Sequence, residues 1–178
     1  MTKVTAITVG IVVLIALTGA LLWNPKTEQA KPKESLPPQA GLPADVESTR
    51  QIIYKAAKER DYETLRGLIK PGAFSYSFGG EVDGNAIEYW KKKEANGNKL
   101  LEKMPLLLTL PYAKQFDICV WPGVFIRSAD EWTKEDLVTL GQIATEQEIE
   151  DFRKFGGYIG YRIGIRSDGT WAYFIAGD

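Results

Sequence analysis

The chain has 178 residues, of which 44% are hydrophobic and 25% charged, a composition typical of a globular protein rather than a disordered or fibrous one. Its 22 Lys and Arg residues nearly balance its 23 Asp and Glu residues, so it has no basic footprint for binding nucleic acid. The absence of histidine excludes His-based catalytic triads and His-ligated zinc, and the single cysteine excludes an intramolecular disulfide or a thiolate cluster.

The N-terminal region contains a run of 20 residues, 4–23, without a charge and with lysine on both sides. A helix of this length spans about 30 Å, the thickness of a hydrocarbon core, and Trp23 suits its interfacial end. The run therefore predicts a transmembrane anchor, residues 1–23, that contacts the lipid bilayer through residues 4–23. A signal peptide cleaved near Ala20 is the alternative, and the continuation of the apolar run to Trp23 favours the anchor.

Residues 24–43 hold five of the nine prolines and no aromatic residue, so we expect them to form an extended linker that buries no core. Counted alone, the positive charges on the two sides of the apolar run favour a cytoplasmic domain. A very short charged tail before a first hydrophobic segment is nevertheless the usual layout of a signal anchor, with the bulk of the chain translocated. We therefore expect residues 44–178 to form one domain outside the cytoplasm, attached to the cell membrane by a single span.

The first half of this domain carries helical periodicity and cap signals. Apolar residues recur on one helical face over residues 45–60, and Asp61 can cap a second, shorter helix. Asn85 predicts the start of a third helix. Residues 100–110 are strongly apolar but contain Pro105, so we expect a kinked or two-part helix there.

One strand signal lies between the second and third of these helices, and another follows the fourth. Alternation of apolar and polar residues predicts one strand over 73–78 and another over 115–121. We assign to the core side of the latter strand Phe116, Ile118 and Val120. Two capping boxes, which start at Thr133 and Thr145, then predict two further helices.

The C-terminal residues 158–178 predict a β-hairpin around Asp168-Gly169, the preferred dipeptide for a two-residue type I′ turn. In the corresponding register Arg166 faces Trp171. Helices that precede strands, without βαβ alternation, indicate an α+β domain. The expected architecture is several helices packed on a small, mostly antiparallel sheet that ends in this hairpin.

The order of these elements resembles that of the NTF2-like (cystatin-like) superfamily: a long helix, a short helix reading RDYETLRGLI, an early strand and a terminal antiparallel run. The resemblance covers most of residues 45–178 and departs from that pattern at residues 133–155, where two helices precede the last hairpin. Residues 158–178 also resemble the ending of uncharacterised bacterial proteins with a single membrane anchor. Neither resemblance implies functional residues in this chain.

One face of the predicted hairpin interleaves arginines and aromatic side chains above glycines, and this face is the candidate site for binding a ligand or partner. Guanidinium groups bind carboxylates or phosphates in a bidentate manner, and glycines let a ligand approach the backbone. The structural alternative is that Arg166 stacks on Trp171 and that Tyr173 covers Gly164. The candidate binding residues are Arg162, Arg166, Trp171 and Tyr173.

A second hypothesis is catalytic. A carboxylate on a concave sheet can act as a general base while a tyrosine polarises a carbonyl, and NTF2-like isomerases and dehydratases work in roughly this way. In this chain those roles would fall to Asp117 and to Tyr76 or Tyr173. The alternative is that Asp117 pairs with an arginine or faces water. Cys119, on a strand without a basic neighbour, is expected to be a small buried hydrophobe.

The sequence thus predicts a membrane-anchored, non-catalytic binding module whose partner is a protein or an envelope component. The second hypothesis is a small-molecule enzyme or binder of NTF2-like shape. The third is an assembly role for a dimer that the anchor concentrates at the membrane. No phosphate-binding glycine loop, EF-hand spacing or GxSxG motif occurs in the sequence, so no cofactor and no metal is expected.

Overall fold

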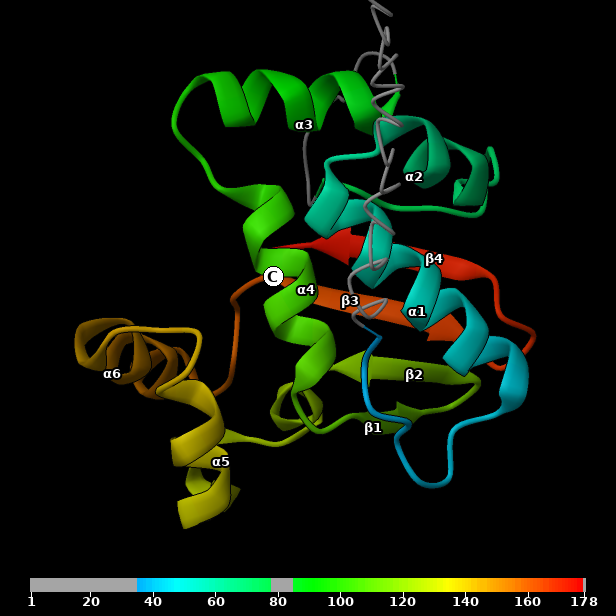
Figure 1. Cartoon of the computed structure of the whole chain (residues 1–178). Helices are drawn as coiled ribbons and strands as arrows, with labels where there is room; N and C mark the ends of the chain where they lie inside the picture. Colours follow the sequence, from blue (N-terminus) through cyan, green and yellow to red (C-terminus); the bar gives the residue numbers. More distant parts are fainter. Residues whose placement is uncertain (1–34, 78–84, 178) are drawn as a thin grey trace, which may run out of the picture. The chain divides into compact units, whose positions relative to one another are not determined.

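The computed structural model describes residues 35–77 and 85–177, which lie within one compact unit, Lys33–Asp178. The predicted membrane segment, residues 4–23, and the part of the predicted linker before residue 35 fall outside the described residues. Within the described ranges, no helix is both long and apolar enough to cross a membrane. The described chain is an α+β fold of six α-helices and a four-stranded antiparallel sheet, as the sequence predicts (Figure 1).

Four helices precede the sheet, and their ends follow the predicted signals. The Asp61 side chain accepts hydrogen bonds from the N–H groups of Glu63 and Thr64, and Asn85 accepts one from the next helix. Residues on both sides of Pro105 belong to one continuous helix, so the two-part alternative is wrong. The helices are α1 (Ala44–Glu59), α2 (Tyr62–Leu68), α3 (Ala86–Ala95) and α4 (Leu100–Thr109).

The sheet is an antiparallel meander in which each strand pairs with its neighbour in sequence, in the order β1-β2-β3-β4 (Figure 1). Its strands are β1 (Ala113–Gln115), β2 (Ile118–Trp121), β3 (Arg162–Arg166) and β4 (Trp171–Ile175). The predicted strand 73–78 is reduced, in its described part, to a parallel bridge between Ser75 and Tyr173 on the outer edge of β4.

A helical insertion separates β2 from β3. It contains the 3-10 turns η1 (Gly123–Ile126) and η2 (Ala129–Glu131) and the helices α5 (Lys134–Leu140) and α6 (Glu146–Phe155). Both predicted capping boxes form, at Thr133 and at Thr145. An antiparallel bridge between Ser128 and Gly157 joins the two ends of the insertion. In Figure 1, α5 and α6 lie beside the lower end of α4 and away from the sheet.

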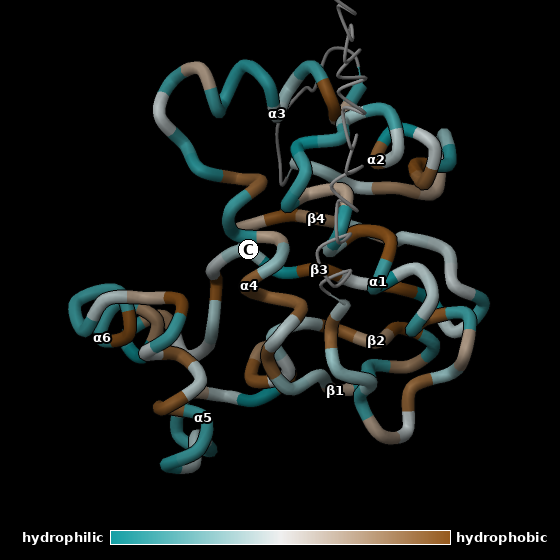
Figure 2. Tube along the Cα trace, in the orientation of Figure 1, coloured by the Kyte–Doolittle hydropathy of each residue, from teal (hydrophilic) through white to brown (hydrophobic). Residues whose placement is uncertain are grey.

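The main core lies where α1 and α4 cover one face of the sheet (Figure 1). Figure 2 shows that hydrophobic residues gather along α4 and the strands, whereas α3 is largely hydrophilic. Near β4 the core is aromatic: the ring centroid of Trp171 lies 4.7 Å from that of Phe74 and 5.6 Å from that of Trp90. Burial of these large rings is the main source of stability for this part of the fold.

The predicted strand 115–121 is instead a tight hairpin, with Phe116 and Asp117 in the turn between β1 and β2. Phe116 has a φ of 56°, and its side chain is 98% exposed, so its assignment to the core is wrong. On β2, Cys119 and Trp121 join the main core and Val120 is also fully buried, whereas Ile118 is half-buried. The turn changes which residues of β2 point toward the core. The alternation of apolar and polar residue types runs on without interruption through 115–121, so it does not reveal this turn.

The C-terminal hairpin forms, and its pairs from Arg162 with Ile175 to Gly164 with Tyr173 are those of the predicted register, but the turn and the pairs next to it differ. Only Gly169 has a positive φ in the loop, whereas a type I′ turn requires positive φ at both central residues. The loop therefore has three residues, 167–169, and a register shift follows next to Gly164. As a result Trp171 pairs with Ile165 rather than Arg166 and turns toward the core.

The folded unit also extends upstream of the predicted boundary at residue 44. Leu36 is buried in the main core, and the Gln39 side chain donates a hydrogen bond to the Leu110 carbonyl at 2.7 Å. The same Gln39 side chain accepts a hydrogen bond from the indole N–H of Trp121 at 3.0 Å. Residues 35–43 are therefore part of the domain, because hydrogen bonds of polar side chains fix a segment that its proline-rich composition predicts to be a linker.

Candidate functional site

The four predicted binding residues do not share an open face. Trp171 is 1% exposed and lies in the core, and Arg162 is 4% exposed. The Arg162 guanidinium donates to the Gly177 carbonyl at 2.7 Å and lies 4.4 Å over the ring of Phe125. The sheet thus separates Trp171 from the arginines, and the expectation that all four lie together is wrong.

The other two residues of the predicted face follow the structural alternative in part. The ring of Tyr173 lies on Gly164, where an added Cβ would approach the ring to 2.3 Å. Burial raises the pKa of the Tyr173 hydroxyl. Arg166 does not stack on Trp171 but forms an ion pair with Asp117 at 3.0 Å. The Arg166 side chain is 40% exposed, and its charge is balanced by that carboxylate.

The residues of the catalytic hypothesis are also apart. Asp117 lies in the turn between β1 and β2, where its ion pair with Arg166 matches the non-catalytic alternative. Tyr76 lies beyond the opposite edge of the sheet and packs against Phe74 and Tyr89. Cys119 is buried as predicted, and burial raises the pKa of its thiol, which disfavours the reactive thiolate.

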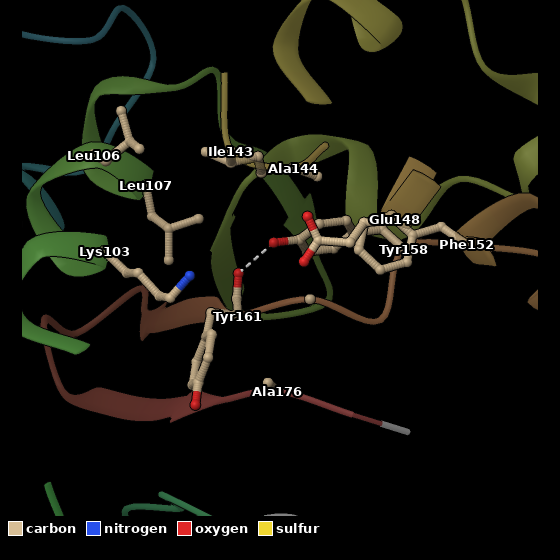
Figure 3. A pocket seen from close by; sticks show the side chains of 11 residues that line it. Lys103, Leu106, Leu107, Ile143, Ala144, Glu148, Phe152, Tyr158, Tyr161 and Ala176 are labelled. Carbon is tan, nitrogen blue, oxygen red and sulfur yellow. Dashed lines mark hydrogen bonds between the residues drawn. The ribbon is translucent and has the colours of Figure 1, made fainter. Parts of the chain in front are cut away.

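A different place in the fold has the shape of a binding site. A pocket of about 230 Å³ opens between α4 and the helical insertion (Figure 3). Its walls come from α4, from the α5–α6 connection, from α6 and from the segments that flank the terminal hairpin. Most of its lining is apolar or aromatic. The lining residues are Lys103, Leu106, Leu107, Ile143, Ala144, Glu148, Phe152, Tyr158, Gly160, Tyr161 and Ala176.

The segment between α6 and β3 forms one wall of the pocket. The Tyr158 hydroxyl donates a hydrogen bond to the Tyr161 carbonyl at 2.7 Å, a contact visible in Figure 3. The Tyr158 ring covers Gly160, where an added Cβ would lie 2.5 Å from the hydroxyl oxygen. Burial raises the pKa values of both tyrosines, so both stay neutral and act as apolar surface with a polar tip.

Two charged side chains reach the same pocket from opposite walls (Figure 3). Lys103 projects from α4, and its ammonium lies 5.6 Å from the ring centroid of Tyr161. Glu148 projects from α6, where it also closes the capping box with Thr145. Hydrogen bonds from the Thr145 N–H and hydroxyl, together with the charge of Lys103, hold the pKa of the Glu148 carboxyl below its usual range. The Glu148 carboxyl is therefore ionised at neutral pH.

The sequence gives no direct signal for this pocket. Its two charged residues are 45 positions apart, and Tyr161 comes from a third segment. The Thr145 capping box predicts where α6 begins, but it does not show which helix α6 faces. In the part of the chain that the structure describes, no group of three or more His, Cys, Asp or Glu side chains could hold a metal ion.

Comparisons with protein-family models, with curated proteins and with solved structures gave no match for this chain. The described residues thus form an α+β domain. Beside its helical insertion lies a mainly apolar pocket that two charged side chains line.

Proposed function

We propose that the chain is a membrane-anchored binding module that holds an apolar group of its ligand in the pocket between α4 and α6. One observation carries this proposal: the pocket combines apolar walls with two charged side chains that can orient a ligand. Small-molecule sites commonly have this composition, with few polar groups in a mainly apolar hollow.

The chemistry of the pocket supports a binding role over catalysis. A general base works best with a pKa near the operating pH, whereas the Glu148 carboxyl has a lowered pKa and is a weak base. The thiol of Cys119 is buried on β2 and does not line the pocket. Lys103 and Glu148 are suited to attract and orient a ligand.

The proposed display outside the cytoplasm comes from the sequence, through the uncharged run at residues 4–23 and the proline-rich segment after it. Protease added to intact spheroplasts should remove the domain and leave a short membrane-embedded stub. Complete protection from protease would place the domain in the cytoplasm, and recovery of the domain from the soluble fraction would indicate signal cleavage near Ala20.

Indole, a neutral apolar probe, tests the pocket itself. Added to the ¹⁵N-labelled full chain in a nonionic detergent, it should shift the amide signals of Ala144, Gly160 and Ala176. The filled-pocket variant Ala144→Phe should abolish these shifts. The control Val138→Phe, at an exposed site on α5 outside the pocket, should preserve them. Equal shifts in parent and Ala144→Phe would contradict binding in the pocket.

A further inference from the structure

The two charged side chains of the pocket are both solvent-exposed, and the protein satisfies only part of their hydrogen-bonding capacity. The Oε2 atom of Glu148 accepts hydrogen bonds from the N–H and the hydroxyl of Thr145, both at 2.8 Å. Its Oε1 atom accepts none from the residues that the structure describes. Within the same residues, Lys103 contacts the face of Tyr161 and forms no ion pair within 4.0 Å of its ammonium. One donor and one acceptor are thus directed into the same hollow (Figure 3).

The apolar part of the pocket limits the size of what it can hold. Leu107 and Phe152 are almost fully buried and line the pocket together with Ile143. The volume of about 230 Å³ is below the range of about 300–1,000 Å³ that is typical of sites for drug-sized molecules. A single branched aliphatic or aromatic group of a small ligand suits this space.

We infer that the pocket binds an apolar α-amino acid, with its carboxylate on Lys103, its ammonium on Oε1 of Glu148, and its side chain toward Leu107 and Phe152. This inference rests on the proposed function, because it names the ligand class of the same pocket. A neutral apolar ligand would form no ion pair with either charge. A purely anionic ligand would pair with Lys103 but would meet the negative charge of Glu148, which disfavours it.

Five related probes separate the contributions of charge and apolar surface. Calorimetric titration of the full chain in a nonionic detergent compares L-leucine with glycine, which lacks the side chain. N-acetyl-L-leucine lacks the positive charge, L-leucinamide lacks the negative charge, and N-acetyl-L-leucinamide lacks both. We expect L-leucine to bind at least tenfold more tightly than each of the other four.

Two variants assign the charges. Lys103→Met should lower the affinity for L-leucine to that of the parent for L-leucinamide. The control Lys154→Met, at an exposed lysine on α6 outside the pocket, should change the affinity for neither ligand. Glu148→Gln should bring L-leucine to the affinity of N-acetyl-L-leucine. Glutamine also serves in a capping box, so α6 should keep its start. The matched control is Glu131→Gln, which alters the capping box of η2 and leaves the pocket unchanged.

The outcomes distinguish the inference from the proposed function. If N-acetyl-L-leucinamide binds as tightly as L-leucine and shifts the amide signals of Ala144 and Gly160, the inferred ligand class is wrong, but the proposal that the pocket binds apolar groups is supported. If N-acetyl-L-leucine binds with the same affinity as L-leucine, the pocket binds anions, and the inference that it binds a zwitterionic amino acid is wrong. If neither indole nor any of the five probes shifts these amides, both the ligand class and the binding role of the pocket are wrong.

Discussion

The helices and sheet of the main body and the helical insertion are stabilised in different ways. In the main body one continuous core contains Trp90, Trp121 and Trp171, all fully buried. The insertion has a much smaller cluster of buried residues, which consists of Val124, Leu140, Phe152 and Tyr158. Apolar burial scales with area, so most of the hydrophobic stabilisation lies in the main body.

Local polar contacts take a larger share in the insertion. Three capping boxes fix its helical turns, at Ser128, Thr133 and Thr145. The Arg127 guanidinium also donates to Asp136 at 2.7 Å. Helices as short as α5 are unstable in isolation, so caps and one small cluster must hold them. The pocket therefore lies between α4, which belongs to the main core, and α6, which is held by few contacts.

The largest expected effect is in the main body. Trp171→Ala removes a fully buried ring that packs on Phe74 and Trp90, and we expect it to lower the free energy of unfolding by about 3–5 kcal/mol. Urea denaturation followed by far-ultraviolet circular dichroism measures this loss. Phe116→Ala, at a 98% exposed aromatic residue, is the control and should change stability little. Equal losses in the two variants would contradict the burial of Trp171.

A smaller and more local effect is expected in the insertion. Phe152→Ala removes the ring that packs 5.1 Å from Tyr158, so α6 should open without unfolding of the main body. Hydrogen exchange should become faster in α6 while amides in α1 and α4 keep their protection. The control Phe155→Ala, on the same helix at a 52% exposed site, should leave exchange in α6 nearly unchanged. Faster exchange throughout the domain would show that the two regions unfold as one.

The smallest effect concerns pH. Burial favours the neutral form of Asp136, but hydrogen bonds from Thr133 and Arg127 outweigh it, so the pKa of this carboxyl lies below its usual range. A depressed folded-state pKa stabilises the fold above the unfolded-state value of about 3.9, and this stabilisation is lost as pH falls through the folded pKa. Parent stability should therefore fall more than that of Asp136→Asn between roughly pH 5 and pH 2.

The control for this experiment is Asp151→Asn, at an exposed carboxylate on α6. It should keep the pH dependence of the parent. If Asp136→Asn also kept the full pH dependence, the ion pair with Arg127 would not contribute to the stability of the insertion.

The sequence predicts elements well where the signal is local. The caps at Asp61, Asn85, Thr133 and Thr145 each depend on residues within three positions, and all four form. The fold class follows from the order of these elements. The face of a strand is less predictable, because one turn or bulge inverts it: the shift next to Gly164 is enough to bury Trp171.

The pocket could not be predicted for a different reason. Lys103 and Glu148 meet only because α6 packs beside α4, and the short amphipathic pattern of α6 does not specify which surface it covers. The segment 35–43 shows the same limit. Its packing depends on hydrogen bonds of Gln39 to residues more than 70 positions away, which composition does not reveal.

The bridge between Ser128 and Gly157 has a consequence for how the sheet assembles. Forty residues, 122–161, separate β2 from β3, and the entropy lost on closing such a loop opposes their pairing. Once Ser128 meets Gly157, the segment 129–156 no longer counts toward that loop, and only residues 122–128 and 157–161 remain as connection. A loop shortened about threefold lowers the closure free energy by about 1 kcal/mol. An insertion whose two ends pair first thus lets β2 and β3 pair as if they were separated by a short loop.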